Sequence, residues 1–298
     1  MKQITVLSGK GGTGKTSLTA AFASLAGRVV LVDCDVDAAN LHLLLAPSVQ
    51  ERHQFVGGAK ARIDPAACSG CGLCTDACRF EALRLDRAAV VDLTLCEGCG
   101  VCADICPQRA VRLEPHVCGE WFISGTRLGP MVHARLNPGD ENSGKLVSTL
   151  RLAAQDLAKR HRAAWILADG SPGIGCPVIS SLTGAGYALL VTEPTLSALA
   201  DLQRVAAVVR HFGVPAGILI NRAGINRAMA ARIEKYAAGN QFTLLGRLDC
   251  DPAFNQAQLA GEPVLSKAGP LLRRTLENAW LALERSFEKE TTPFTVIR

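Results

Sequence analysis

The sequence has 298 residues, 48% of them hydrophobic, and a formal net charge of +5 with its cysteines counted as thiols. This length accommodates one large α/β domain and a small module, and no apolar run approaches the ~20 residues that span a bilayer. The chain enters a strand-like run at once, so we expect no signal peptide and a cytoplasmic location. Thiolates that hold metal would cancel most of the positive charge, so the composition does not indicate nucleic-acid binding.

A glycine-rich segment, Ser8–Ser17, lies between a strand-like apolar run and a helix-like run of small residues. It matches the G-x-x-x-x-G-K-[ST] pattern, in which backbone N–H groups and a helix dipole face a phosphate. We expect Lys15 to reach the β/γ-phosphates and Thr16 to bind Mg²⁺. The predicted nucleoside triphosphate site consists of Gly9, Lys10, Gly11, Gly12, Thr13, Gly14, Lys15, Thr16 and Ser17.

A second lysine, Lys10, follows Gly9 directly and gives the segment Gly-Lys-Gly-Gly-Thr-Gly-Lys-Thr. This segment resembles the deviant Walker A motif of the MinD/ParA/Mrp and nitrogenase-iron-protein group of dimeric ATPases. In that family the early lysine reaches the partner subunit's phosphates, as an arginine finger would. The resemblance implies ATP as the nucleotide, catalytic roles for Lys10 and Lys15, and a nucleotide-dependent homodimer or a heterodimer with a paralogue. The alternative is that Lys10 is a solvated loop residue.

Three further residues at predicted strand ends extend the resemblance, which implies a doubly wound, mostly parallel α/β fold. Asp35 matches the family's aspartate that positions the attacking water, although Asp33–Asp37 also fits a cap for the next helix. Asp169, in an Asp-Gly-Ser-Pro-Gly segment, resembles the Walker B aspartate that acts on Mg²⁺ through water. Asn221 stands where the family has an asparagine that contacts adenine.

Two copies of a C-x2-C-x2-C-x3-C run lie between Ala66 and Pro107. This is the spacing of a bacterial two-cluster ferredoxin, in which the fourth cysteine of each run crosses to the other cluster. Zinc is the alternative, but a doubled repeat with these closing spacings favours iron and sulfur over zinc. The predicted ligands of the two [4Fe–4S] clusters are Cys68, Cys71, Cys74 and Cys106 for the first and Cys96, Cys99, Cys102 and Cys78 for the second.

The motifs predict an ATPase into which a small α+β dicluster ferredoxin domain is inserted. The expected ranges are 1–59 for the first part of the ATPase, 60–115 for the ferredoxin domain and 116–298 for the second part of the ATPase. We expect residues 121–146 to form a surface loop that leads into a helix capped at Ser143. The helix near Pro270–Phe287 has apolar residues at helical spacing, for which packing in the core is favoured over membrane binding.

Two cysteines outside the repeats suggest a third metal site. Cys176 follows the Asp169 loop, and the nitrogenase iron protein has a similarly placed cysteine that ligates a cluster shared across the dimer axis. The resemblance therefore yields the hypothesis that Cys176, with or without Cys118, binds a bridging cluster. The alternative for Cys176 is a small buried thiol that packs behind the loop.

Two functions fit the combination of modules. The first is ATP-driven electron transfer to a redox or metallocluster partner protein. The second is an ATP-dependent carrier or assembly factor for metal clusters, whose ATPase relatives use a C-x-x-C pair near the C-terminus. No such pair follows Cys106, which favours electron transfer. Positioning of cargo on a membrane or on DNA would leave the predicted redox module unexplained.

Overall fold

The computed structural model describes residues 1–140 and 143–290. The chain forms two compact units, each of which has its own core. The larger unit comprises Met1–Arg52, Phe122–Ala134 and Ser143–Arg298, and the smaller one comprises His53–Trp121 and Arg135–Asn142. The smaller unit therefore begins before residue 60 and also takes up a short segment beyond residue 134.

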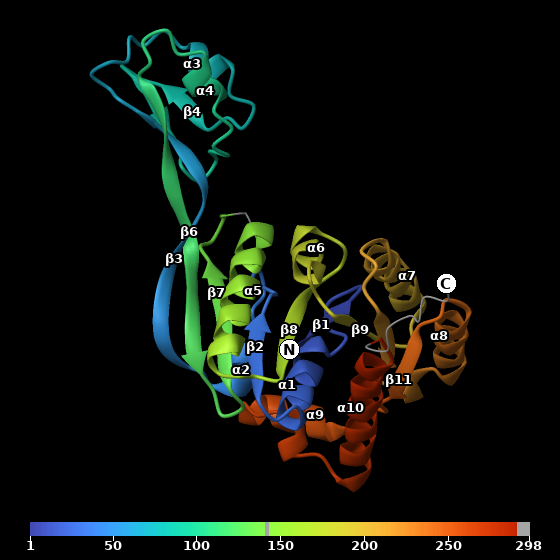
Figure 1. The fold of residues 1–298 in the computed structure, drawn as a ribbon. Coiled ribbons are helices and arrows are strands. Elements are labelled where there is room, and N and C mark those ends of the chain that lie inside the picture. The colour runs from blue at the N-terminus through green and yellow to red at the C-terminus, as the bar shows by residue number, and fades with distance from the viewer. Residues whose placement is uncertain (141–142, 291–298) are drawn as a thin grey trace, which may run out of the picture. The chain divides into compact units, whose positions relative to one another are not determined.

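The strands of the larger unit belong to a nine-stranded sheet (Figure 1), whose last two strands, β6 and β3, lie mostly in the residue range of the smaller unit. The six neighbouring strand pairs from β11 to β7 are parallel. Strands β2 and β9 are buried along their whole length, as continuous apolar runs of a central parallel sheet should be. The mostly parallel α/β fold is confirmed. In sheet order the strands are β11 (Thr243–Arg247), β10 (Ala216–Ile220), β9 (Tyr187–Thr192), β1 (Lys2–Ser8), β8 (Trp165–Pro172), β2 (Val29–Asp33), β7 (Pro130–Leu136), β6 (Val111–Gly125) and β3 (Ser48–Ile63).

Helices cover both faces of this sheet. Side chains alternate along β1, so that Ile4 and Val6 belong to one core and Leu7 belongs to the other. The first core includes residues of α1 (Lys15–Leu25), α2 (Leu41–Leu45), α9 (Pro252–Ala260) and α10 (Pro270–Glu290), with the short helix η2 (Val264–Ser266). The second includes residues of α6 (Cys176–Leu182), α7 (Leu196–His211) and α8 (Arg227–Gly239), with η1 (Ala223–Ile225) nearby and α5 (Ser143–Arg160) packed against α6.

The expected surface loop at residues 121–146 is wrong over much of its length. Strand β6 continues to Gly125, and β7 then pairs in parallel with β2. Met131 and Val132 of β7 are fully buried, so this stretch gains its stability from the neighbouring strand and not from its own composition. The predicted helix after this stretch is confirmed, but α5 begins at Ser143 itself, so the position of its cap lies outside the described residues.

The smaller unit repeats one local structure. Helices α3 (Leu73–Asp76) and α4 (Val101–Asp104) each follow a glycine with positive φ, which is 78° at Gly72 and 86° at Gly100. Glycine adopts this left-handed conformation without steric cost, so each cysteine run turns into its short helix in the same way. An antiparallel pair joins β4 (Leu83–Leu85) to β5 (Ala89–Val91).

The C-terminal helix α10 packs in the core, as predicted. The Trp280 ring lies 5.0 Å from the Trp165 ring and 5.8 Å from the Phe22 ring, measured between centroids. Leu276 and Leu283 of the same helix are fully buried. Among the residues that the structure describes, no helix is both long enough and apolar enough to cross a membrane.

Replacing Trp280 with Ala should lower the free energy of unfolding by about 3–5 kcal/mol, because the large buried side chain leaves a cavity. Urea denaturation of the purified chain measures this difference. Leu271→Ala on the same helix is the matched control, since Leu271 is 80% exposed and its loss should change stability by less than about 0.5 kcal/mol. Equal effects of the two substitutions would contradict the core position of α10.

Candidate functional site

The glycine-rich loop connects β1 to α1 and is held from behind by one asparagine. Gly14 precedes α1 with φ 95°, and a Cβ there would lie 2.5 Å from Nδ2 of Asn221. Only glycine fits this conformation and this contact. The Asn221 amide donates a hydrogen bond to the carbonyl oxygen of Thr13, at 2.8 Å. Asn221 thereby fixes the path of the loop on its inner side.

The N-terminus of α1 lacks a side-chain cap. Its cap residue, Gly14, makes no side-chain hydrogen bond to the first N–H groups, and no acidic residue lies in its first turn. Three other helices of the larger unit, α7, α8 and α9, are capped by Thr195, Asn226 and Asp251. Unsatisfied N–H groups at the positive end of a helix attract an anion. The loop and the start of α1 therefore fit a phosphate group.

Two buried aspartates lie beside each other below this loop. Asp33 at the end of β2 pairs in register with Asp169 of β8, and both are fully buried. The hydroxyl of Thr16 donates to Oδ2 of Asp169 at 2.6 Å, and that of Thr19 donates to Oδ1 at 3.2 Å. Thr19 was not among the predicted residues, although its place nearly one helical turn after Thr16 puts both hydroxyls on one side of α1.

Burial changes the acidity of the aspartates. It raises the pKa of Asp169 to about 6, although Lys15 and the Thr16 hydrogen bond act in the opposite direction. Burial and the charge of Asp169 also raise the pKa of Asp33 well above its usual value. Burial raises the pKa of Asp35, against the effect of Lys15. The site thus holds three aspartates, whereas the charge that lowers the pKa of Asp169 and Asp35 comes from one lysine, Lys15.

Asp33 and Asp35 have different surroundings. Asp33 accepts hydrogen bonds from the backbone N–H groups of Leu41, at 3.1 Å, and of Asp35, at 3.2 Å. Asp33 thus accepts from the first N–H group of α2, which begins at Leu41, in line with the capping role that the sequence also allowed. Asp35 instead lines the cavity in front of the loop, as its place at the end of a strand predicted.

This cavity has a volume of about 980 Å³. It is lined by Asp35, by Asn221 and by the predicted loop residues Gly11, Gly12, Gly14, Lys15, Thr16 and Ser17. Its other wall was missed and comes from the segment 249–258, with Asp249, Asp251, Phe254 and Gln258 among the lining residues. The available signal was the Asp251-Pro252 pair shortly after the last strand, because ligands bind at the carboxyl ends of parallel strands.

Lys10 is engaged within its own chain. Its ammonium lies 2.6 Å from Oε1 of Glu193, and Arg222 binds the other carboxylate oxygen of Glu193 at 3.1 Å. Gly9 precedes it where a Cβ would lie 2.4 Å from the backbone of Asp201, so the loop runs tightly along α7. The structure therefore places Lys10 beside Glu193, and its proposed reach to a partner subunit stays a prediction.

The smaller unit contains two cavities lined by cysteines. One is lined by Cys68, Cys71, Cys74 and Cys106, and the other by Cys78, Cys96, Cys99 and Cys102. These are the two groups of four cysteines that the repeat predicted. In each cavity the fourth cysteine, Cys106 or Cys78, comes from the other run. All eight thiols are free of disulfides. Backbone N–H groups of Ala61 and Ala110 donate to the sulfurs of Cys96 and Cys106, at 3.4 and 3.3 Å.

The two remaining candidates differ in exposure. Cys176 is exposed and is the first residue of α6 in the larger unit. Cys118 is buried in the smaller unit, and its thiol donates to the carbonyl oxygen of His116 at 3.6 Å. The alternative of a buried thiol at position 176 is therefore wrong. A cluster that both cysteines share stays a hypothesis.

The chain matches the model of the CobQ/CobB/MinD/ParA nucleotide-binding domain over residues 4–264. A protein of Methanocaldococcus jannaschii described as uncharacterized is 34% identical over 227 residues, which are 75% of this chain and 79% of that protein. A putative septum site-determining protein MinD of Oltmannsiellopsis viridis is 28% identical over 93% of this chain and 74% of that protein.

Solved structures show the same fold. The septum site-determining protein MinD of Pyrococcus horikoshii, in complex with Mg-ADP, has a TM-score of 0.60 at 18% identity, covering 98% of this chain and 99% of that one. The cell-division ATPase MinD of Pyrococcus furiosus has a TM-score of 0.57 at 20% identity, covering 96% and 99%. The fold and the loop together define a P-loop nucleotide-binding protein. The chain belongs to the CobQ/CobB/MinD/ParA nucleotide-binding family.

The raised pKa of Asp169 predicts a pH-dependent stability. The folded chain keeps this proton up to about pH 6, whereas an unfolded aspartate loses it near pH 4. The stability associated with this proton is fully present below the pKa of the unfolded aspartate, near 4. It is lost as the pH rises through the pKa of Asp169 in the folded chain, about 6. The free energy of unfolding of the nucleotide-free chain should fall in this window by at most about 1.4 kcal/mol per pH unit.

Asp169→Asn should make this part of the pH profile less steep, because the amide cannot titrate and only the contributions of Asp33 and Asp35 remain. Urea denaturation at a series of pH values measures the slope. Asp156→Asn is the control, since the side chain of Asp156 is 73% exposed and its loss should leave the slope intact. An unchanged slope in Asp169→Asn would show that another group carries it.

Proposed function

We propose that this chain is an ATPase that couples its nucleotide state to electron transfer, through an inserted two-cluster ferredoxin domain, to a redox or metallocluster partner protein in the cytoplasm. One observation carries the proposal: the smaller unit gathers its repeat cysteines into two cavities of four thiols each. The larger unit has the fold and loop of a MinD/ParA ATPase. A chain that combines the two can make electron transfer depend on ATP.

The cysteine cavities suit resident clusters. Cys74, Cys96 and Cys102 are buried in the hydrophobic core of the smaller unit, so a group bound there would be held as part of the fold. Backbone N–H groups of Ala89 and Gly70 lower the pKa of Cys68, which favours the thiolate that binds iron. A [4Fe–4S] cluster supplies one-electron transfer when bound. Burial favours this role over the alternative, a factor that hands clusters on to other proteins.

Each predicted residue of the nucleotide site would have a distinct role in binding or hydrolysis. Lys15 and the amides of the loop would hold the phosphates, and Thr16 would hold Mg²⁺ with Asp169 behind it. Asp35 lines the cavity and would orient the attacking water. Lys10 would complete the site of a second subunit in a nucleotide-dependent dimer, which requires that it leave Glu193.

The full chain, purified without oxygen, should contain about eight irons, which is the content of two four-iron clusters. Cys71→Ala should remove or convert one cluster and leave the other, because Cys71 lines only one of the two cavities. Iron analysis and electron paramagnetic resonance measure both effects. Cys250→Ala is the control, since Cys250 lines the nucleotide cavity instead. Stoichiometric zinc with no iron after reconstitution would overturn the assignment.

The function is tested by reducing the chain and measuring electron transfer to proteins encoded by neighbouring genes, with and without MgATP. Transfer should require ATP. Lys15→Ala should abolish nucleotide binding, because it removes the main charge opposite the β/γ-phosphates. Lys10→Ala should spare binding more than hydrolysis. Transfer that proceeds equally without nucleotide would refute the coupling, and similar losses of binding in both variants would refute the role of Lys10 in trans.

A further inference from the structure

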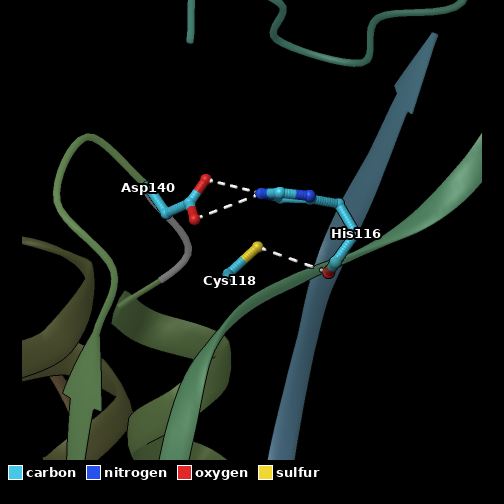
Figure 2. A group of neighbouring side chains, drawn as sticks. All are labelled: His116, Cys118 and Asp140. Atoms are coloured by element: carbon cyan, nitrogen blue, oxygen red, sulfur yellow. Dashed lines mark hydrogen bonds and ion pairs between the residues drawn. The ribbon is translucent and has the colours of Figure 1, made fainter. Parts of the chain in front are cut away.

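A histidine, a cysteine and an aspartate converge in the smaller unit, outside both cysteine cavities. A ring nitrogen of His116, the Sγ atom of Cys118 and a carboxylate oxygen of Asp140 all lie within 4.8 Å of one another. Figure 2 shows the three side chains turned toward one another, with the Asp140 carboxylate facing the edge of the His116 ring. The Nε2 atom lies 2.9 Å from Oδ1 of Asp140 and 3.1 Å from Oδ2.

The strand geometry explains why two of these groups meet. His116 and Cys118 are two residues apart on β6, so their side chains leave the same face of the strand. Gly57 makes room for the thiol, because a Cβ at that position would lie 2.8 Å from Cys118 Sγ. A larger residue at position 57 would push the sulfur away from the histidine.

The third group, Asp140, lies on a turn that is hydrogen-bonded to the same strand, β6. The backbone N–H of Asn137 donates to the carbonyl oxygen of Cys118 at 2.8 Å. Its side-chain amide donates to the carbonyl oxygen of Val117 at 2.9 Å and to Oδ2 of Asp140 at 3.2 Å. Asn137 therefore both anchors the turn and orients the carboxylate, as residues around metal ligands do.

A lysine also lies beside the carboxylate. The Lys60 ammonium is 3.3 Å from Oδ1 of Asp140 and donates to the carbonyl oxygen of Leu93 at 2.6 Å. A carboxylate has two oxygens, so one can bind a metal while the other keeps hydrogen bonds to its neighbours. The Leu93 carbonyl gives the ammonium a second partner when the carboxylate turns toward an ion.

The cluster opens into a small cavity of about 50 Å³, which is also lined by Glu97 and by the cysteine-cavity residue Cys96. This volume has room for one or two water molecules. Zinc sites with three protein ligands and one open position use sulfur, imidazole nitrogen and carboxylate oxygen as donors. The three side chains present one donor of each kind, next to space for a water ligand.

We propose that His116, Cys118 and Asp140 bind one divalent metal ion of the zinc class, with solvent in the remaining position. Ligand atoms in a tetrahedral zinc site are roughly 3.3–3.7 Å apart, given the metal–ligand bond lengths. The Nε2 atom of His116 lies 2.9 Å from Oδ1 of Asp140, just below this range, and all three ligand atoms lie within 4.8 Å of one another, so an ion would need these side chains to adjust around it. The proposal is independent of the clusters and of ATP, and it assigns a ligand role to a cysteine that the repeats leave unused.

The test uses the full chain after its iron content has been restored. Zinc is added to this protein, and desalting then removes the zinc that is not bound. One zinc per chain should be retained. X-ray absorption at the zinc edge is not obscured by iron and should show one sulfur neighbour near ~2.3 Å and nitrogen or oxygen neighbours near ~2.0 Å. Cys118→Ser should remove the sulfur neighbour and weaken zinc binding by at least about 10-fold.

Asp140→Asn is the second variant, because it keeps the shape of the side chain and should also weaken zinc binding. Glu97→Gln is the matched control, since Glu97 lines the cavity but is not part of the cluster. Iron content and nucleotide binding report whether each variant is folded. The proposal is overturned if iron-replete wild type retains no zinc, if its zinc has three or four sulfur neighbours, or if folded Cys118→Ser and Asp140→Asn retain zinc as wild type does.

Discussion

The parallel pairing of β2 with β8 sets Asp33 beside Asp169 in a part of the sheet that is closed to solvent. Two adjacent carboxylates cannot both stay ionised there without compensation. Lys15, Thr16 and Thr19 supply part of it from the first turns of α1. The glycine-rich loop, the start of α1 and the ends of the two strands therefore form one electrostatic unit, in which the loss of a single partner leaves a buried charge unsatisfied.

This unit is unbalanced in two opposite ways. The cap residue of α1, Gly14, offers its N–H groups no side-chain acceptor, whereas the strand ends beneath it hold more acidic groups than Lys15 can balance. A nucleotide with its magnesium ion would supply both missing partners. Its phosphates are anions that the N–H groups of α1 can bind, and its metal is a cation that can balance the aspartates. Asn221 keeps the loop in shape until they arrive, through its bond to the Thr13 carbonyl.

The sequence predicted best what is encoded by contiguous spacing. The glycine-rich loop and the cysteine runs have fixed local geometry, so their residues could be grouped before the fold was known. The strand β7 could not be foreseen, because its burial depends on β2, far away in the chain. The same is true of the cavity wall at 249–258 and of the meeting of His116 with Asp140, which arise from contacts between distant segments. Polar composition at residues 121–146 suggested a loop, since propensity alone does not report a neighbouring strand.

Lys10 would have to leave its ion pair with Glu193 to reach a second subunit. Glu193 also holds Arg222, so its carboxylate keeps a counter-ion when Lys10 departs. A part-exposed pair of this kind is worth about 0–1 kcal/mol. In the proposed dimer, the release of Lys10 from Glu193 would therefore add little to the free-energy cost of assembly.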